Sequence, residues 1–251
     1  MNIVSDLPAP PHLPLNETAL FLDVDGTLVE LAPTPESVVV PPDLVPTLQK
    51  LHHALGGALA IVSGRTIAML DRLLGTTGLP MAGVHGGQLR PYAGGEITEV
   101  NPHLPAALQE RVWAVIDDLR KQWPGVRGED KGPAFSFHYR LAPEAEPAVH
   151  AALVALNLGP EWEILSGHLI YEIRSRGQSK AEAVRRLMQL PTFVGRKPVF
   201  AGDDRTDLDG IRMAVELGGT GIAVAGLEAS SARWALRDPT AVRAWLRSLA
   251  G

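Results

Sequence analysis

The sequence contains no cysteine, and only 5% of its 251 residues are aromatic. Without cysteine the chain forms neither disulfides nor thiolate metal sites, and a reducing compartment suits it. No apolar run approaches the roughly 20 residues that span a bilayer, so we expect no membrane association. Residues 1–16 lack the basic stretch and apolar run of a signal peptide. We therefore expect a cytoplasmic protein.

Basic residues are outnumbered, with 23 Lys and Arg against 28 Asp and Glu and a net charge of -5. Proteins that bind nucleic acid use basic surfaces to displace counterions from phosphates, so we expect no nucleic-acid partner. The length allows one large or two small domains. Nothing in the composition determines the oligomeric state, and we favour a monomer.

The two ends of the chain alternate between short apolar runs and helical patterns. Runs that suit buried strands occur at 19–22, 58–62, 80–84, 199–201 and 221–225. Helical spacing is found at 43–55 and 66–74, from the capping box at Ser179 and Glu182, and from near Thr206, and two short helices are expected at the end. This alternation predicts an α/β domain with a doubly wound sheet.

The middle of the chain follows a different pattern. A hairpin (88–91 with 96–100) precedes helices at 105–123 and 144–156, a strand at 134–139, and a second hairpin (162–165 with 169–173) that turns at Ser166-Gly167-His168. We expect an α+β domain inserted into the α/β domain. The predicted parts are a flexible, proline-rich segment at 1–16, the α/β domain at 17–101 and 174–251, and the insertion at 102–173, with hinges near Asn101 and Ser175.

Carboxylates follow two of the predicted strands directly. Asp23 and Asp25 come after the first strand, and Asp203 and Asp204 come after the run at 199–201. The ends of parallel strands converge, so these side chains are expected to share one site. Two carboxylates about 4 Å apart repel each other by roughly 4 kcal/mol near a protein surface. An all-oxygen cluster of this kind suits Mg²⁺.

Two further residues complete a site for a phosphate dianion. Ser63 follows another predicted strand, and Lys180 lies just inside a helix start. In such a site Asp23 could attack phosphorus, which divides one slow hydrolysis into two easier steps through an aspartyl-phosphate. Asp25 could protonate the leaving oxygen and later deprotonate water.

Each feature has an ordinary interpretation when it is taken alone. Asp-x-Asp-Gly occurs by chance in turns, and it also begins like a calcium loop, although the expected glutamate is absent. Lysine at a helix start is commonly solvated, and serine commonly caps a turn. Gly202-Asp203-Asp204 is similar to a polymerase motif, but the chain is too short and too acidic for a polymerase. The four features together, each at an element end, favour the phosphatase interpretation.

These features, in this order, resemble the four motifs of the haloacid dehalogenase superfamily. The motifs match at Asp23-Val24-Asp25-Gly26-Thr27, Ser63, Lys180 and Gly202-Asp203-Asp204. The resemblance implies a Rossmann-like core with an inserted C2-type cap. It also implies Mg²⁺ bound by Asp23, Asp203 and the Asp25 backbone carbonyl, phosphoryl oxygens bound by Ser63, Gly64 and Lys180, and supporting roles for Thr27, Asp204 and Asp207.

Narrower features resemble the family of trehalose-6-phosphate phosphatases. These are Ser63-Gly64-Arg65, Gly83 to Gly87, the runs Gly128 to Gly132 and Phe137 to Arg140, and Gly202 to Asp207. The resemblance implies that a sugar phosphate contacts Arg65 and His85 in the core and Glu129, Lys131, His138, Arg140 and Glu172 in the cap. The alternation of 135–139 independently places Ser136 and His138 on one strand face and the aromatic residues on the other.

Two positions depart from the family pattern. Ala181 follows Lys180 where glycine is usual, and Leu208 stands where glutamate is usual. Neither belongs to the phosphoryl site, so the predicted reaction is unaffected. The alternatives are a phosphatase for sucrose phosphate, mannosylphosphoglycerate or a hexose phosphate, a phosphomutase, and a catalytically silent sugar-phosphate sensor. The presence of both Asp23 and Asp25 argues against the sensor.

Overall fold

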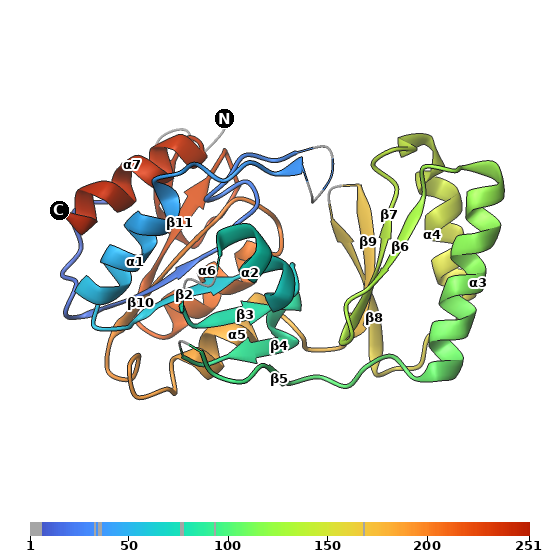
Figure 1. The fold of residues 1–251 in the computed structure, drawn as a ribbon, viewed down its shortest axis with the longest axis horizontal. Helices are drawn as coiled ribbons and strands as arrows, with labels where there is room; N and C mark the ends of the chain where they lie inside the picture. The colour runs from blue at the N-terminus through green and yellow to red at the C-terminus, as the bar shows by residue number, and fades with distance from the viewer. Residues whose placement is uncertain (1–6, 33, 35–36, 76–77, 93, 168) are drawn as a thin grey trace. The chain divides into compact units, whose positions relative to one another are not determined.

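The computed structural model describes residues 7–32, 34, 37–75, 78–92, 94–167 and 169–251. The chain divides into two compact units. The core unit extends to Thr98 and resumes at Ser179, and the cap unit spans Glu99–Gln178. Each unit has its own sheet and its own apolar core (Figure 1).

An eight-stranded sheet organises the core unit, with the order β12-β11-β10-β1-β2-β3-β4-β5. Its strands are β1 (Thr18–Leu22), β2 (Leu59–Val62), β3 (Met81–Gly83), β4 (Gln88–Arg90), β5 (Thr98–Glu99), β10 (Lys197–Gly202), β11 (Thr220–Val224) and β12 (Ala232–Leu236). The chain runs outward from β1 through β2 and β3, and later outward in the other direction from β10, which pairs in parallel with β1. This reversal is a topological switch point, where open α/β sheets bind ligands beyond the carboxyl ends of their strands.

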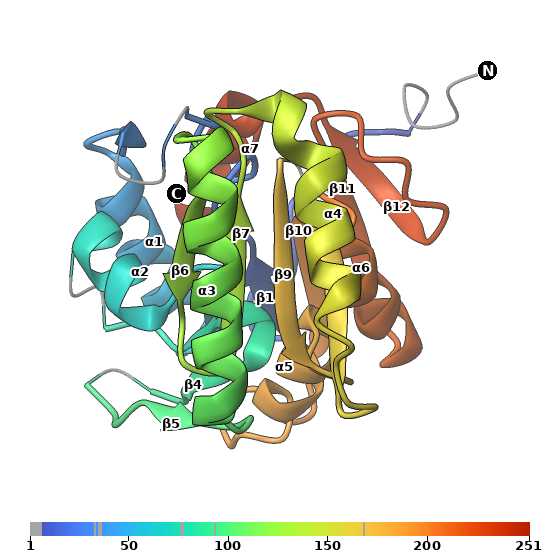
Figure 2. The ribbon, with the colours of Figure 1, turned by 90° about the vertical axis from the view of Figure 1, so that its right-hand side faces the viewer.

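In the described part of the chain, five α-helices flank this sheet, and their start signals are readable in the sequence. They are α1 (Leu44–Ala54), α2 (Ile67–Leu74), α5 (Lys180–Leu187), α6 (Asp207–Glu216) and α7 (Pro239–Ala250). The α5 helix begins after Ser179, whose side chain accepts a hydrogen bond from Glu182 N at 3.2 Å, as the capping box predicts. Figure 2 shows α1 and α2 on one side of the sheet and α6 on the other, so β1 is fully buried between the two layers.

A four-stranded antiparallel sheet organises the cap unit, with the order β6-β7-β9-β8. Its strands are β6 (Arg127–Asp130), β7 (Ala134–His138), β8 (Trp162–Gly167) and β9 (Ile170–Ser175), and the helices α3 (Ala106–Gln122) and α4 (Glu146–Ala155) cover one face (Figure 1). Phe135 and Phe137 are fully buried in the apolar cluster beneath these helices. The alternation predicted for this strand is confirmed.

Most predicted elements are present, and the exceptions concern polar strands and the end of the chain. The two short helices expected after 225 are wrong, because the chain forms strand β12 and then one helix, α7, after the Asp238 cap. Strand β6 was not predicted. In the predicted Ser166-Gly167-His168 turn, His168 lies outside the described residues.

Part of the segment expected to be flexible packs against the rest of the core unit. Pro8 O accepts a hydrogen bond from Ala235 N at 3.0 Å, Pro11 O accepts one from the Trp245 indole at 3.3 Å, and Leu13 is buried. These contacts hold this stretch beside β12 and α7. Across the described residues, every helix is too short or too polar to cross a bilayer.

Candidate active site

Three neighbouring strands of the core sheet end beside one another and deliver the predicted polar residues. Asp23 follows β1, Asp203 follows β10 and Ser63 follows β2. Leu22, the last residue of β1, pairs with Ala201 on one side and Ile61 on the other, so the three strands end at nearly the same level. The convergence predicted from the sequence is therefore present in the fold.

Lys180 joins two of these carboxylates. Its Nζ lies 2.7 Å from Asp23 Oδ1 and 2.6 Å from Asp207 Oδ1, and its side chain is only 3% exposed. Lys180 is the first residue of α5, so the Ser179 cap that begins this helix also fixes where the ammonium group lies. Burial lowers the pKa of Lys180, but Asp207 and Asp23 outweigh this effect and raise the pKa overall, which keeps the ammonium group charged.

Asp207 connects the ion pair to the backbone of the fourth motif. One of its carboxylate oxygens accepts from Lys180, and the other accepts from Asp203 N at 3.2 Å and Asp204 N at 3.0 Å. Asp204 accepts from Thr206 N at 2.6 Å and so braces the same turn. With both oxygens engaged, Asp207 is suited to positioning Lys180 and Asp203.

Asp23, Asp203 and Asp207 form a carboxylate cluster in which one oxygen of each residue lies within 4.8 Å of the other two. Burial and repulsion from Asp207 raise the pKa of Asp23 to about 8. Burial and repulsion from Asp23 raise the pKa of Asp203 to about 7, and burial raises that of Asp207 to about 6. Lys180 therefore does not offset all of the negative charge. The surplus and the all-oxygen donor set fit a hard divalent cation such as Mg²⁺.

Gly26 and Thr27 hold Asp203 in place. Gly26 has a φ of +82°, and a Cβ atom at this position would lie 2.0 Å from Asp203 Oδ2. Thr27 is buried, and its hydroxyl donates to Asp203 Oδ1 at 2.9 Å. Only glycine allows the first motif to approach the fourth this closely. The contact between the motifs explains the Gly-Thr pair, whose part in holding Asp203 was not evident from its spacing.

Asp25 lies beside Arg65. Arg65 Nε donates to Asp25 Oδ2 and an Arg65 Nη donates to Asp25 Oδ1, both at 2.7 Å. Both residues belong to the core unit. The Arg65 side chain is 10% exposed and the Asp25 side chain is 30% exposed. Sequence comparison with the family nominated Arg65 as a sugar ligand, and that role stays a prediction. The ion pair with Asp25 was not predicted.

The turn after β3 braces the second motif. His85 N donates to Ser63 O at 2.9 Å and Val84 N donates to Arg65 O at 2.8 Å. Val84 and His85 have φ values of 50° and 52°, which is unusual for residues other than glycine and is rarest for a β-branched one. A Cβ atom on Gly64 would lie 2.6 Å from His85 Nε2, so the imidazole rests directly against this glycine.

Four of the five predicted cap residues, together with Ser136, meet on the face of the cap sheet opposite the helices. We call this group the polar face: Glu129, Lys131, Ser136, His138 and Glu172. Lys131 Nζ and Ser136 Oγ donate to the same Glu172 oxygen at 2.9 Å and 2.8 Å, and His138 Nε2 lies 2.8 Å from Glu129 Oε2. The sheet register aligns Glu129, Ser136 and Glu172 in one row across β6, β7 and β9.

The polar face contains a buried ion pair and a carboxyl group with a lowered pKa. Lys131 and Glu172 form an ion pair whose side chains are only 7% and 4% exposed. Burial alone would raise the pKa of Glu129, but hydrogen bonding to His138 and the Lys131 charge lower it overall. Arg140 follows β7 in a turn and is half-buried. Ser136 was predicted to lie on the same strand face as His138 but was not predicted as a site residue. That shared face could have identified it as one.

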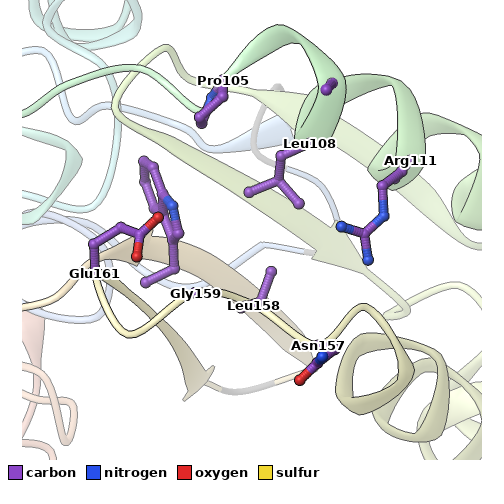
Figure 3. Close-up of a pocket in the computed structure, with 9 residues that line it drawn as sticks. Pro105, Leu108, Arg111, Asn157, Leu158, Gly159 and Glu161 are labelled. Atoms are coloured by element: carbon purple, nitrogen blue, oxygen red, sulfur yellow. The ribbon is translucent and has the colours of Figure 1, made fainter.

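A cavity of about 240 Å³ lies elsewhere in the cap unit, lined by Pro105, Ala107, Leu108, Arg111, Asn157, Leu158, Gly159, Glu161 and Trp162. Figure 3 shows Leu108 and Leu158 in its middle, with Arg111 and Glu161 toward opposite ends. None of the predicted site residues lines this cavity.

The chain is similar in sequence to known trehalose-phosphatases over most of its length. The trehalose-phosphatase family model matches residues 21–240. Trehalose-6-phosphate phosphatase of Escherichia coli (strain K12) is 39% identical over 94% of this chain and 90% of that protein. A probable trehalose-phosphate phosphatase of Sinorhizobium fredii (strain NBRC 101917 / NGR234) is 38% identical over 94% and 89%.

The fold is also shared with a solved structure. The C-terminal domain of C. albicans trehalose-6-phosphate phosphatase aligns with a TM-score of 0.82 and 23% identity, over 98% of this chain and 99% of that one. The predicted fold class, an α/β core with an inserted α+β domain, is confirmed. By the match over most of its length, the chain belongs to the trehalose-phosphatase family.

Proposed function

We propose that this protein hydrolyses trehalose 6-phosphate to trehalose and inorganic phosphate, with Asp23 as the nucleophile. The observation that carries the proposal is the buried contact of 2.7 Å between Lys180 and Asp23, which lies within the carboxylate cluster at the switch point of the sheet. Family membership supports the substrate, because the named relatives act on this ester.

The reaction divides into two transfers. First, a carboxylate oxygen of Asp23 attacks phosphorus, the ester P–O bond breaks, and the Asp25 carboxyl gives its proton to the leaving sugar oxygen. Then water attacks the aspartyl-phosphate, its proton goes to Asp25, and breaking of the P–O bond restores Asp23 and releases phosphate. The net reaction therefore consumes one water and converts the phosphate ester to inorganic phosphate and the free sugar hydroxyl.

Charge in this pocket must be balanced for a phosphate dianion to enter. Lys180 supplies one buried positive charge, and we propose that Ser63 Oγ and the Gly64 backbone N–H bind phosphoryl oxygens. Mg²⁺ fits the oxygen donors, and we propose that the Asp23 and Asp203 carboxylates and the Asp25 carbonyl hold it. When bound, it would neutralise the charge on the carboxylates and on the transferred phosphoryl group.

The cap unit is proposed to select the disaccharide. Sugar hydroxyls are recognised by side chains that both donate and accept hydrogen bonds, and the polar face presents carboxylates, an ammonium group and an imidazole side by side. We propose that Lys131, His138 and Glu172 contact the glucose units, together with Glu129 and Arg140. His85 is proposed to contribute from the core, whereas the contact of Arg65 with Asp25 favours a different role for that residue.

A phosphate-release assay tests this function. We expect the wild-type protein to release phosphate from trehalose 6-phosphate in Mg²⁺, to stop when a chelator is added, and to recover when Mg²⁺ returns. Asp23→Asn should abolish turnover with the fold intact. Turnover of sucrose phosphate, mannosylphosphoglycerate or a hexose phosphate in preference to the trehalose ester would overturn the substrate assignment. Interconversion of sugar phosphates without free phosphate would indicate a mutase.

A further inference from the structure

We propose that Arg65 is a positioning residue that orients the Asp25 carboxylate for proton transfer; the proposal rests on the function proposed above. The guanidinium makes two parallel contacts of 2.7 Å, one to each oxygen of Asp25. A bidentate contact fixes the plane of a carboxylate as well as its position. A single hydrogen bond or a lone ammonium group would fix only its position.

The backbone of Arg65 is itself held in place by hydrogen bonds. Its backbone N donates to Ser63 Oγ at 3.2 Å, and its carbonyl accepts from Val84 N at 2.8 Å. The next residue, Thr66, caps α2 by accepting from Met69 N at 3.2 Å. The Arg65 side chain is only 10% exposed, so neighbouring atoms also restrict it. Asp25 is therefore tied to the same short segment that carries Ser63.

The pair leaves Asp25 able to act on a substrate. A carboxylate has about four lone-pair directions, and a bidentate guanidinium uses one on each oxygen. The remaining directions are available to carry a proton toward the leaving oxygen. A proton donor must come within about 2.6–3.2 Å of its acceptor. A displacement of about 1 Å can cost on the order of a hundredfold in rate, so a mobile Asp25 would be a poor acid.

The chemistry of the leaving group separates positioning from sugar binding. The alkoxide of trehalose needs a proton as it leaves, whereas the p-nitrophenolate ion does not. We expect Arg65→Gln to lower kcat/KM for trehalose 6-phosphate on the order of 10- to 100-fold. For p-nitrophenyl phosphate, kcat/KM should change by less than about threefold, because it reports only steps up to phosphoryl transfer. For trehalose 6-phosphate, the kcat/KM of Arg65→Lys should lie between that of Arg65→Gln and that of the wild type.

Binding of a non-hydrolysable analogue provides the second readout. We expect the Kd of trehalose 6-sulfate, measured by calorimetry, to be unchanged in Arg65→Gln. A sugar ligand would instead show a weaker Kd together with the lost activity. In the Asp25→Ala protein, single-turnover rates on trehalose 6-phosphate should be the same with and without Arg65→Gln, because a residue that acts through Asp25 has no further effect once Asp25 is absent.

The chain offers a matched control for loss of a buried pair. Arg90 makes a bidentate pair with Asp71 at 2.8 Å and 2.8 Å, with side chains 7% and 24% exposed, outside the candidate site. Arg90→Gln should leave the ratio of the two esters' kcat/KM values unchanged. The positioning role is overturned if Arg65→Gln lowers both esters equally, weakens the sulfate analogue, or keeps its full effect without Asp25. If the wild type ignores trehalose 6-phosphate, the proposed function fails, and the alkyl phosphate it does hydrolyse replaces that ester in the same test.

Discussion

Replacing the nucleophile should make the metal-free protein more stable while abolishing its activity. In the folded chain, burial and repulsion from Asp207 raise the pKa of Asp23 to about 8 from its ordinary value of 3.8. Between these values the folded state binds a proton that the unfolded state does not. Folding stability therefore falls as pH rises from about 4 to about 8. The amide side chain introduced by Asp23→Asn stays neutral throughout, so the variant avoids this loss.

The magnitude follows from the change in proton affinity. At about 1.4 kcal/mol for each tenfold change, a rise from 3.8 to about 8 corresponds to at most about 6 kcal/mol at pH 8. Water entry and local relaxation reduce such penalties, and loss of the charged contact with Lys180 opposes the gain. We expect a net gain of about 1–3 kcal/mol. For a chain of this length that is a Tm increase of about 2–10 °C.

Thermal unfolding in a chelator at pH 5 and pH 8 measures this effect. The Tm difference between Asp23→Asn and wild type should be clearly larger at pH 8. Mg²⁺ should raise the Tm of the wild type more than that of the variant, because the variant replaces a charged ligand with a neutral one. Asp117→Asn is the control, since its carboxylate is 70% exposed, and it should change neither Tm. An equal or negative shift at both pH values would refute the charge argument.

Three further substitutions test other parts of the structure. Gly26→Ala places a Cβ 2.0 Å from Asp203 Oδ2 at a φ of +82°, and we expect phosphatase activity to fall by at least tenfold, with a higher Mg²⁺ requirement in titration. Lys131→Ala and His138→Ala should reduce kcat/KM for the disaccharide ester far more than for p-nitrophenyl phosphate, and equal losses would remove these residues from the sugar site. Ser179→Ala removes the α5 cap and should cost about 1 kcal/mol in denaturant unfolding, whereas Ser179→Thr should retain most of it.

The phosphoryl half of the site was predictable because it depends on strand ends. Apolar runs mark β1, β2 and β10, and a parallel sheet brings the residues after such runs to one edge. The cap residues were less accessible to this reasoning. Alternation in β7 identified the face of His138, but the neighbours of that residue depend on strand order, which local pattern does not contain.

The elements that sequence reasoning missed are edge strands in which few side chains are buried. Strand β6 consists of Arg127–Asp130 and has partly or fully exposed side chains, as an edge strand does. Strand β12 is an edge strand of the core sheet, and Arg233 and Trp234 in it are not fully buried. Backbone pairing with β11 decides its conformation. Side-chain periodicity carries little information about such edges.

The contacts between site residues could not be predicted for a different reason: they depend on the tertiary structure. The same region also contains features that destabilise the fold. From the sequence alone Arg65 could equally have faced a sugar, and its contact with Asp25 is visible only in the folded structure. Around the same edge, Val84 and His85 hold left-handed backbone conformations, and the carboxylate cluster keeps pKa values far above their ordinary range. Each of these features is unfavourable by itself and would be lost in a sequence selected for stability alone. The surplus of carboxylate charge where three strands end supports the proposed cation, which would offset that charge and allow the dianion of a phosphate ester to enter.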